Sequence, residues 1–305
     1  MIKSRKYIKE DAIKVCEFLG KLYQLNNKSQ HSWLPFRWDY MVYLLTPAFT
    51  LGGYKKLEDT TFLWETEEGE IIGMINSEEP KQAHIQIHPN FRYIEEEMIS
   101  WAENNIALLD NDKNIKSIII WATDDDYYRH KLLEKCVYKR SVEYYEYQLC
   151  QNLNNKVIPE PKLPEGYSIH SLEEGIDILK RCELEGKVFT RYSLPEEIYL
   201  NLKKSSLYRF NLDLVTMLGD GTITSFCTIW YDEMNHIAKF EPVGTHPDHR
   251  KKGLGSAMLL DGLKRLKNLG VETAYVDAGS EDNLNFYRSA GFNPININRP
   301  WYKEF

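Results

Sequence analysis

The sequence predicts an α/β protein built of two tandem domains, and two observations carry this expectation. The same order of helices and strands is predicted twice along the chain. Between the two copies, residues 151–166 are rich in asparagine and proline, which is typical of a linker. A chain of 305 residues with 43% hydrophobic side chains is long enough for two cores. We therefore expect domains at residues 1–150 and 166–305, joined by a linker at 151–165.

The first half is predicted to begin with a short strand and an amphipathic helix. The helix is indicated by apolar residues at helical spacing: Ala12, Val15, Cys16, Leu19 and Leu22. Two hydrophobic runs, at 62–64 and 71–75, flank Glu68-Gly69 and predict a hairpin. A strand at 84–87, a helix through Trp101, a strand at 118–121 and a helix over Leu132-Leu133 follow.

The second half repeats this order. Hydrophobic runs at 212–218 and 223–230 flank Gly219-Asp220-Gly221, and a further strand is predicted at 237–240. A helix follows, because Met258, Leu259, Leu263 and Leu266 recur at helical spacing. A strand at 273–276 and a short helix complete the copy.

The loop between strand and helix in the second half is predicted to bind an anion. It contains Arg250, Lys251, Lys252, Gly253, Leu254, Gly255 and Ser256. A helix start presents free backbone N–H groups and the positive end of the helix dipole, which suit a phosphate or pyrophosphate. The two glycines allow close approach to the backbone, and the three basic residues add positive charge. The spacing matches neither a Walker loop nor a dinucleotide-binding fingerprint.

The pattern R-x-x-G-x-G after a V-x-T-H-P-x-x-R loop resembles the cofactor-binding motif of the GNAT acetyltransferase superfamily. Residues 283–292, which run from Asn283 through Tyr287 to Gly291-Phe292, are similar to a second motif of these enzymes. The resemblance covers most of residues 165–305, and residues 1–150 only by pattern. It implies two GNAT-like domains, each a central mixed, mostly antiparallel β-sheet flanked by helices.

The two halves can be aligned through a shared H-P-x-x-R loop. His88-Pro89-Asn90-Phe91-Arg92 corresponds to His246-Pro247-Asp248-His249-Arg250. After it, the first half has Glu95, Glu96 and Glu97 in place of the glycine-bearing segment. Like charges a few ångströms apart cost on the order of 1 kcal/mol or more. Leu133 stands where the second half has Tyr287, so we expect the first domain to be degenerate and non-catalytic.

Family resemblance implies acetyl-CoA as cosubstrate and direct transfer of the acetyl group to an amine. By position, Val243 and Thr245 would pair with the pantetheine arm, and the backbone of 251–256 would hold the pyrophosphate. Lys251 and Lys252 would reach the adenosine phosphate or remain solvated. Asn283 would bind the cofactor arm, cap its helix, or do both.

Two residues are candidates for proton transfer. Glu241, on the strand beside the expected thioester, is the candidate base that deprotonates the amine; the alternative is a solvent-exposed carboxylate. On an unbulged strand it would share a face with Val243. Tyr287 is the candidate proton donor to the leaving thiolate, or a packed aromatic. Pro242 predicts a bulge or a splay of the strands, because proline disrupts a central ladder.

Composition excludes several other functions. The net charge of −7 and a pI near 5.7 argue against nucleic-acid binding. Five scattered cysteines indicate reduced thiols, and Cys227 is expected to be a buried, inert thiol. His246 and His249 lack a third ligand at suitable spacing, so we expect no metal. No apolar run reaches the length of a membrane span, and no signal-peptide core is present, so a cytoplasmic protein is expected.

A second class of function stays open: a non-catalytic acyl-CoA sensor that kept the phosphate loop alone. Retention of Glu241 and Tyr287 favours the enzyme. Its acceptor is expected to be an amine of a small molecule or peptide, and the protein a monomer or homodimer. The acceptor pocket is expected from segments 188–194, 293–302 and Trp230-Tyr231. An aromatic-rich stretch at 31–54 is expected either to pack on its own core or to help form that pocket.

Overall fold

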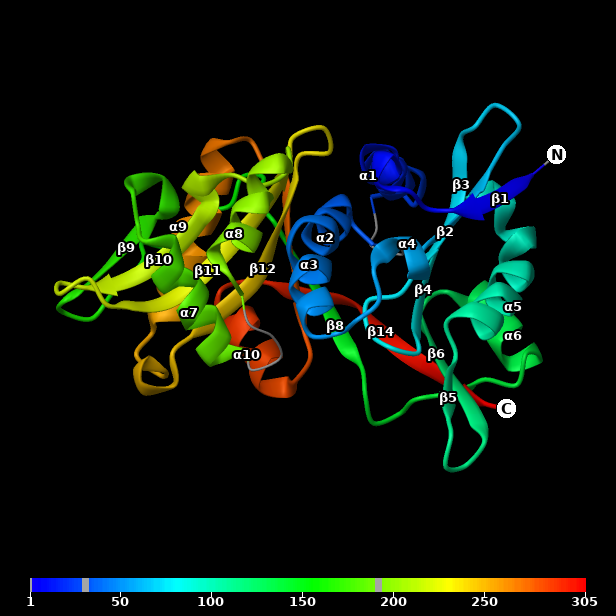
Figure 1. Ribbon diagram of the computed structural model, residues 1–305. Helices are drawn as coiled ribbons and strands as arrows, with labels where there is room; N and C mark the ends of the chain where they lie inside the picture. The colour runs from blue at the N-terminus through cyan, green and yellow to red at the C-terminus, as the bar shows by residue number, and fades with distance from the viewer. Residues whose placement is uncertain (1, 29–32, 190–193) are drawn as a thin grey trace. The chain divides into compact units, whose positions relative to one another are not determined.

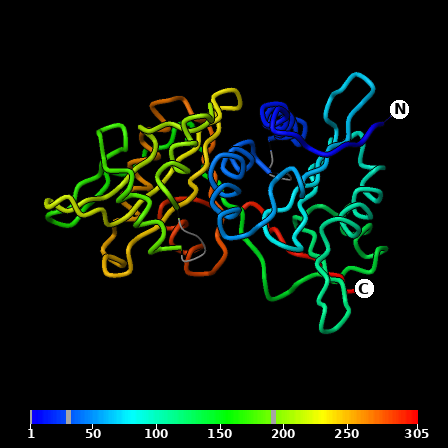
Figure 2. Tube along the Cα trace, in the orientation of Figure 1, coloured from blue at the N-terminus to red at the C-terminus, as the bar shows by residue number. Residues whose placement is uncertain are grey.

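The computed structural model describes residues 2–28, 33–189 and 194–305 and divides the chain into two compact units. Unit 1 comprises Met1–Glu146 and Asn296–Phe305, and unit 2 comprises Tyr147–Ile295. The C-terminal strand, red in Figures 1 and 2, therefore belongs to unit 1. These boundaries differ from the expected division at residues 150 and 166.

The sheet of unit 1 has the order β1-β2-β3-β4-β6-β14, in which β4 and β6 are parallel and the other neighbouring strands are antiparallel. Two short strands, β5 and β7, pair with β6 and β14. The strands are β1 (Lys3–Lys6), β2 (Phe62–Glu65), β3 (Ile71–Asn76), β4 (Gln82–Ile87), β5 (Leu108–Asp110), β6 (Ile115–Thr123), β7 (Lys139–Arg140) and β14 (Asn293–Glu304).

Unit 2 has a sheet of the same topology, with the order β9-β10-β11-β12-β13-β8. Only β12 and β13 are parallel. The strands are β8 (Glu146–Asn152), β9 (Tyr167–Ser171), β10 (Asp213–Leu218), β11 (Ile223–Asp232), β12 (Ile237–Thr245) and β13 (Thr273–Ala278). The prediction of two mixed, mostly antiparallel sheets is confirmed.

The two halves of the chain exchange their last strands. β8, at the end of the first half, pairs with β13 of unit 2. β14, at the end of the second half, pairs with β6 of unit 1. In each unit the strand from the other half takes the same place, antiparallel to the strand that follows the long helix. The expected linker therefore begins inside β8, which ends at Asn152.

Helices flank both sheets (Figure 1). Those of unit 1 are α1 (Ala12–Leu25), α2 (Pro35–Tyr40), α3 (Thr46–Leu51), α4 (Leu57–Thr60), α5 (Glu95–Asn105) and α6 (Tyr127–Lys135). Those of unit 2 are α7 (Ile178–Val188), α8 (Glu196–Tyr199), α9 (Leu254–Asn268) and α10 (Glu281–Ser289). Among the described residues, no helix is both long enough and apolar enough to span a membrane.

Local hydrogen bonds confirm the alignment of the two H-P-x-x-R loops. The His88 Nδ1 accepts from the Asn90 backbone, and the His246 Nδ1 accepts from the Asp248 backbone in the same way. In each loop the histidine carbonyl then accepts a backbone hydrogen bond from the residue three positions later. Phe91 donates to His88, and His249 donates to His246. The same side-chain and backbone pattern therefore shapes both loops.

The ends of the last helices also correspond. Val137 and Gly291 both adopt positive φ, at 67° and 96°. The next residues donate backbone hydrogen bonds in the same pattern, from Tyr138 to Leu133 and from Phe292 to Tyr287. Leu133 and Tyr287 thus hold equivalent positions, as the sequence alignment predicts.

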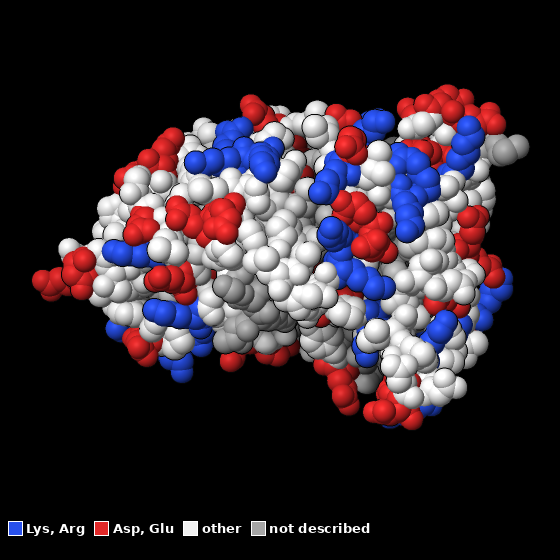
Figure 3. Space-filling model, viewed as in Figure 1, with Lys and Arg blue, Asp and Glu red and all other residues white. Residues whose placement is uncertain are grey.

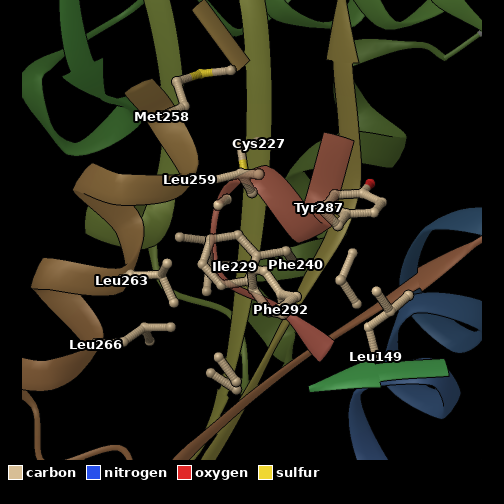
Figure 4. Packing of buried hydrophobic residues seen from close by; sticks show 14 of the residues in the cluster. Leu149, Cys227, Ile229, Phe240, Met258, Leu259, Leu263, Leu266, Tyr287 and Phe292 are labelled. Atoms are coloured by element: carbon tan, nitrogen blue, oxygen red, sulfur yellow. The ribbon is translucent and has the colours of Figure 1, made fainter. Parts of the chain in front are cut away.

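The core of unit 2 lies between its sheet and helices α9 and α10 (Figure 4). Leu259, Leu263 and Leu266 of α9 pack with Ile229 of β11 and Phe240 of β12, all fully or almost fully buried. The helical spacing of these leucines is the pattern that predicted α9. Burying one such side chain contributes about 1.5–3 kcal/mol.

Gly262 marks the closest approach of α9 to the sheet. A Cβ there would lie 2.4 Å from Ile229 Cδ1 and 2.8 Å from Phe240 Cε1. We expect Gly262→Ala to lower the free energy of unfolding by about 1–3 kcal/mol through overpacking, despite the better helix propensity of alanine. Urea unfolding measures this effect. Gly186→Ala in α7 is the matched control, because no atom lies within 4 Å of the added Cβ, and it should stabilise by up to about 1 kcal/mol.

Candidate active site

Strand β12 leaves its parallel neighbour halfway along its length. It pairs with β13 only from Ile237 to Lys239, opposite Thr273 to Tyr275. On its other side the register with β11 shifts between Cys227 and Ile229, so that Glu241 and Pro242 lie opposite Thr228. The Glu241–Pro242 peptide bond is cis. The predicted bulge and splay at Pro242 are confirmed. Beyond Lys239 and Tyr275, β12 and β13 no longer pair with each other, and we call these two stretches, Phe240–Thr245 and 276–278, the fork.

The bulge changes which side chains share a face of β12. Ala238, Phe240 and Val243 pack against the core under α9 and α10. Glu241 instead lies on the face of Lys239, whose Nζ is 3.6 Å from Glu241 Oε2 and 2.5 Å from Asp277 Oδ2. On an unbulged strand Glu241 and Val243 would share a face. The extra residue in the bulge places them on opposite faces instead.

The backbone of Glu241 is also held in place. The Trp230 indole N–H donates to the Glu241 carbonyl over 2.6 Å. Trp230 is buried and its ring contacts Tyr208, with centroids 5.9 Å apart. Tyr231 points to the opposite face, where its hydroxyl donates to Leu269 O. Trp230 and Tyr231, both expected in the acceptor pocket, therefore lie on opposite faces of the sheet. Trp230 supports the strand that carries Glu241.

At the far end of β12 the chain enters the predicted anion loop and then α9. Gly253 is the N-cap of α9 with φ of +80°, and no atom lies within 4 Å of where its Cβ would be. Leu254, Gly255 and Ser256 are the first helical residues, so their N–H groups have no acceptor within the helix. The loop therefore presents an open glycine and free donors at a helix N-terminus.

Gly255 has a different requirement from Gly253. A Cβ on Gly255 would lie 3.0 Å from Phe286 Cζ, on α10. Its small size therefore allows the start of α9 to pack on α10. From the sequence, both glycines were expected to allow close approach of the ligand. In the structure, Gly255 is also needed for helix packing.

The basic and histidine side chains of the loop make contacts within unit 2. The Arg250 Nε donates to the Thr245 carbonyl over 3.1 Å, which ties the loop to β12. The Lys252 Nζ lies 3.2 Å from the Tyr167 hydroxyl, and that hydroxyl lies 2.9 Å from His249 Nδ1. Arg250 and Lys252 are thus oriented by the protein itself. Both histidines make contacts within unit 2, His246 with the Asp248 backbone and His249 with Tyr167.

Tyr287 lies on α10 at the edge of the unit 2 core. Its ring packs on Phe292, with centroids 6.2 Å apart, and its hydroxyl is directed away from the packed side chains of Ile229 and Phe240 (Figure 4). Burial raises the pKa of Tyr287, and the Cys227 thiol and the carboxylates of Asp277 and Glu241 raise it further. The phenol is therefore protonated at neutral pH, and its electrostatic neighbours are the groups of the fork.

Two other predictions at this site can be compared with the structure. Asn283 is exposed on α10, and the helix is capped by Ser280, whose Oγ accepts from the Asn283 backbone over 3.2 Å. The N-cap alternative for Asn283 is therefore wrong. Cys227 is fully buried, and burial raises the pKa of its thiol, which confirms the inert thiol.

The segments expected to form the acceptor pocket are only partly placed. Within 188–194, Arg191 and Tyr192 lie outside the described residues. Phe189 packs on Phe226, with ring centroids 5.9 Å apart. Residues 296–302 of the other segment belong to unit 1. In the aromatic-rich stretch at 31–54, His31 lies outside the described residues, whereas Phe36, Trp38 and Tyr40 are buried, as expected for packing on its own core.

In unit 1 the counterpart of the anion loop contains a buried ion-pair cluster. Glu95 takes the place of Gly253 and is fully buried. It accepts from Arg92 Nε over 2.8 Å and from Arg129 Nε. Arg92 also pairs with Asp126, the N-cap of α6. Only Glu95 turns into the loop, since Glu96 pairs with the exposed Lys135 and Glu97 accepts from the Trp64 indole.

The fork of unit 1 is occupied by aromatic rings. Strands β4 and β6 pair only at Gln82–Ile119 and Ala83–Ile120, and the next residues are His84 and Trp121. Their rings are nearly parallel, with centroids 6.1 Å apart, and the tilted ring of Trp33 also packs on His84, with centroids 4.9 Å apart. Burial and the positive charges of Arg37 and Arg129 lower the pKa of His84 to about 3, so the imidazole is neutral.

We expect Glu95→Gln to lower the free energy of unfolding by about 3–5 kcal/mol, because it leaves the buried guanidinium of Arg129 and the partly buried one of Arg92 with one carboxylate fewer. Chemical denaturation measures the change. Glu96→Gln, on the same helix turn, removes only an exposed ion pair with Lys135 and should cost less than about 1 kcal/mol. Equal stabilities of the two variants would contradict the assigned role of Glu95.

The surface charges, a cavity in unit 1 and the potential metal ligands were compared with the needs of a binding site. Lysine and arginine side chains alternate with carboxylates over the face seen in Figure 3. A cavity of about 150 Å³ in unit 1 is lined by Arg92, Arg129, Asp125 and Asp126 among others, but both arginines are already paired with carboxylates. No group of three potential metal ligands is found among residues 2–28, 33–189 and 194–305.

Comparison with known proteins relates unit 2 to a known family. Residues 176–292 match the model of the acetyltransferase (GNAT) family. The matched region lies entirely within unit 2 and ends before β14. No part of unit 1 falls in the match.

Similar proteins include one curated relative and several solved structures. A mycothiol acetyltransferase of Streptomyces coelicolor is 27% identical over 152 residues. The matched part is 48% of this chain and 48% of that protein, so the chain spans about half the length of this relative. A GCN5-related N-acetyltransferase from Sphaerobacter thermophilus has a TM-score of 0.65 at 17% identity over 99% of this chain and 95% of its own. A tandem GNAT protein from the clavulanic acid biosynthesis pathway has a TM-score of 0.62 at 13% identity over 100% and 98%. The tandem fold is thus shared along the whole chain.

Two charged residues of the site were not predicted from the sequence. Lys239 is buried at the fork and contacts both Asp277 and Glu241. A signal was present, because Lys239 and Glu241 stand two apart on a strand and therefore share a face. No local pattern indicates Asp277, which reaches the fork from a strand about 40 residues later in the chain.

Proposed function

We propose that unit 2 is an acetyl-CoA-dependent N-acetyltransferase that transfers acetyl directly to an amine of a small molecule or peptide. One observation carries the proposal: the edge of β12 that does not pair with β13 leads through the loop at 246–253 to an open helix N-terminus. An edge strand can hydrogen-bond an extended amide chain, and a helix N-terminus binds a pyrophosphate. Coenzyme A contains both groups, in that order from its thiol end.

The cofactor contacts follow from this placement. Val243 and Thr245 lie on the strand edge beside the pantetheine amides. The N–H groups of 251–256 receive the pyrophosphate, and the lysines at 251 and 252 contribute charge near the adenosine phosphate. Arg250 acts by holding the loop, since its Nε is bonded to Thr245 O. Asn283, exposed near the start of α10, binds the cofactor arm.

The chemical step needs a neutral amine and a protonated leaving group. Glu241 accepts the amine proton, directly or through a water, as nitrogen attacks the thioester carbonyl. When the tetrahedral adduct collapses, the carbon–sulfur bond breaks and the Tyr287 hydroxyl donates a proton to the thiolate. The raised pKa means that the Tyr287 phenol carries its proton at neutral pH, before the thiolate forms.

Unit 1 is proposed to be a degenerate copy that does not bind acetyl-CoA. The Glu95 carboxylate occupies the aligned place of Gly253 and is bound by two arginines. Aromatic side chains surround His84 at its fork, and Leu133 replaces the tyrosine. Among the described residues of unit 1, the position aligned with the phosphate loop is thus filled by an ion pair, and the position aligned with Tyr287 has no proton donor.

A panel of amines assayed with acetyl-CoA and a thiol-detecting reagent tests the proposed function. The panel includes amino sugars, an amino-sugar thiol, polyamines and peptide N-termini, with the amino-sugar thiol suggested by the resemblance to a mycothiol acetyltransferase. Amine-dependent release of coenzyme A supports an enzyme. Tight acetyl-CoA binding without release by any amine supports the acyl-CoA sensor instead.

We expect Tyr287→Phe to lower kcat about 10²-fold while the Kd for acetyl-CoA stays unchanged. The variant removes the hydroxyl and keeps the ring against Phe292. Steady-state kinetics and calorimetry measure the two quantities. Tyr231→Phe, which removes another buried hydroxyl of unit 2 that donates to Leu269 O, should retain wild-type kcat. Full activity of Tyr287→Phe would exclude it as the proton donor.

A further inference from the structure

The fork contains a charged cluster that the proposed chemistry does not yet use. Lys239 is the last residue of β12 that pairs with β13, so its side chain stands where the two strands separate. Its side chain is 4% exposed, whereas those of Glu241 and Asp277 are 24% and 29% exposed. A buried ammonium between two partly exposed carboxylates therefore bridges the two arms of the fork.

A buried lysine is costly unless its charge is compensated. Here the compensation comes from one carboxylate on each strand, at 2.5 Å for Asp277 and 3.6 Å for Glu241. The shorter contact, with Asp277, anchors the ammonium to β13. The longer contact joins it to Glu241 in the bulge of β12. Lys239 is thereby fixed from one side and acts on Glu241 from the other.

We propose that Lys239, anchored by Asp277, is a positioning residue that holds the Glu241 carboxylate in place at the fork for proton abstraction. This inference rests on the proposed function of Glu241 as the base. The titratable groups facing the cluster are Tyr287 on α10 and the Cys227 thiol on β11; Tyr287 interacts electrostatically with this thiol and with the carboxylates of Asp277 and Glu241. Of these groups and Lys239, only Lys239 is positively charged at neutral pH.

The charges of the cluster determine the expected pH dependence. With Lys239 present, the cluster of one ammonium and two carboxylates has a net charge of −1. Lys239→Met keeps a similar volume and leaves −2, which favours protonation of Glu241. The acidic limb of the kcat/KM profile should then move to higher pH. Asp277→Asn keeps Lys239 and leaves no net charge, so the same limb should move to lower pH.

A double variant separates charge from position. Lys239→Met with Asp277→Asn restores the net charge of −1 but removes the group that contacts Glu241. We expect the acidic limb to return toward its wild-type pH, whereas kcat remains at least about tenfold below wild type. Full recovery of kcat in the double variant would overturn the positioning role, because charge alone would then explain the effect.

The experiment measures kcat, KM and pH profiles of the full chain, with Lys264→Met as the matched control. Lys264 also pairs with a carboxylate, Glu160 at 2.6 Å, but on the exposed surface of unit 2. We expect Lys239→Met to lower kcat at least about tenfold with an unchanged Kd for acetyl-CoA, and Lys264→Met to match wild type. Wild-type kcat and pH profile in Lys239→Met would overturn the proposal. If that variant does not fold, an unchanged pH profile in Asp277→Asn overturns it equally.

A readout that does not depend on turnover separates this inference from the proposed function. In protein labelled with ¹³C at glutamate carboxyl groups, the Glu241 signal is the one lost in Glu241→Gln. Its titration should move to higher pH in Lys239→Met and to lower pH in Asp277→Asn. These shifts in a protein that acetylates no amine would support the charged cluster and reject the enzyme. Unchanged titration in an active enzyme would reject the cluster's role alone.

Discussion

Gly253→Asp is expected to weaken acetyl-CoA binding by at least about 10³-fold, so that calorimetry on the full chain detects no binding. The position lies at the N-cap of α9, next to the free N–H groups that receive the pyrophosphate. A carboxylate there meets a ligand of like charge at a few ångströms. It also accepts hydrogen bonds from the helix start and removes the donors that the pyrophosphate needs.

The variant should fold normally, which makes the loss of binding interpretable. No atom lies within 4 Å of the added Cβ. Aspartate is a favoured N-cap and interacts well with the helix dipole, which offsets the cost of about 1 kcal/mol for a side chain at φ of +80°. An unfolding midpoint close to that of wild type is therefore expected.

Two controls separate charge from conformation. Gly253→Asn has the same shape without the charge and should weaken binding much less, by about tenfold. Gly221→Asp adds a carboxylate at another glycine of positive φ, 84°, in the β10–β11 turn, and should leave binding intact. Wild-type affinity in Gly253→Asp, or two sites of similar affinity in the wild-type chain, would contradict the single site in unit 2.

Glu241→Gln is expected to lower kcat/KM by about 10²–10⁴-fold near neutral pH, the usual contribution of a positioned base. The amide cannot accept the proton of an ammonium, yet it keeps the shape of the side chain beside Lys239. At pH 9 to 10 the loss should shrink, because free amine accumulates and needs no base. A rate profile against pH with one well-accepted amine measures this convergence.

The control for this variant is Glu160→Gln, an exposed carboxylate of unit 2 paired with Lys264. It should follow the wild-type profile at every pH. An equal loss at all pH values in Glu241→Gln would indicate a binding or structural role for this residue. An unchanged rate would show that Glu241 takes no part in proton transfer.

The sequence predicted the central strands and the long helices of both units, and their order. Local signals suffice for this purpose. Apolar residues at helical spacing identify α9, Glu68-Gly69 and Gly219-Asp220-Gly221 identify hairpins, and the repeated H-P-x-x-R loop aligns the two halves. The same signals placed the glycine-bearing helix start, because positive φ at Gly253 and free N–H groups are properties of a few neighbouring residues.

The division of the chain into units was not predictable in the same way. A strand's sequence records which of its faces is buried, but not which of two similar sheets it joins. β8 and β14 are both terminal strands of a repeat, and each pairs within the sheet made by the other half. A fragment cut at residue 160 would therefore lose β8 from unit 2 and carry β14 without its partner β6.

At the site, the sequence by itself determined which residues could carry the chemistry: Glu241, Tyr287 and the loop from Arg250 to Ser256. The tertiary structure decided how they are arranged. The bulge at Pro242 moved Glu241 to the face of Lys239, and Asp277 joined them from β13. In unit 1, only Glu95 of three consecutive glutamates turned inward, where two arginines compensate its charge. Such outcomes depend on strand register and on partners distant in the chain, which spacing along one segment does not contain.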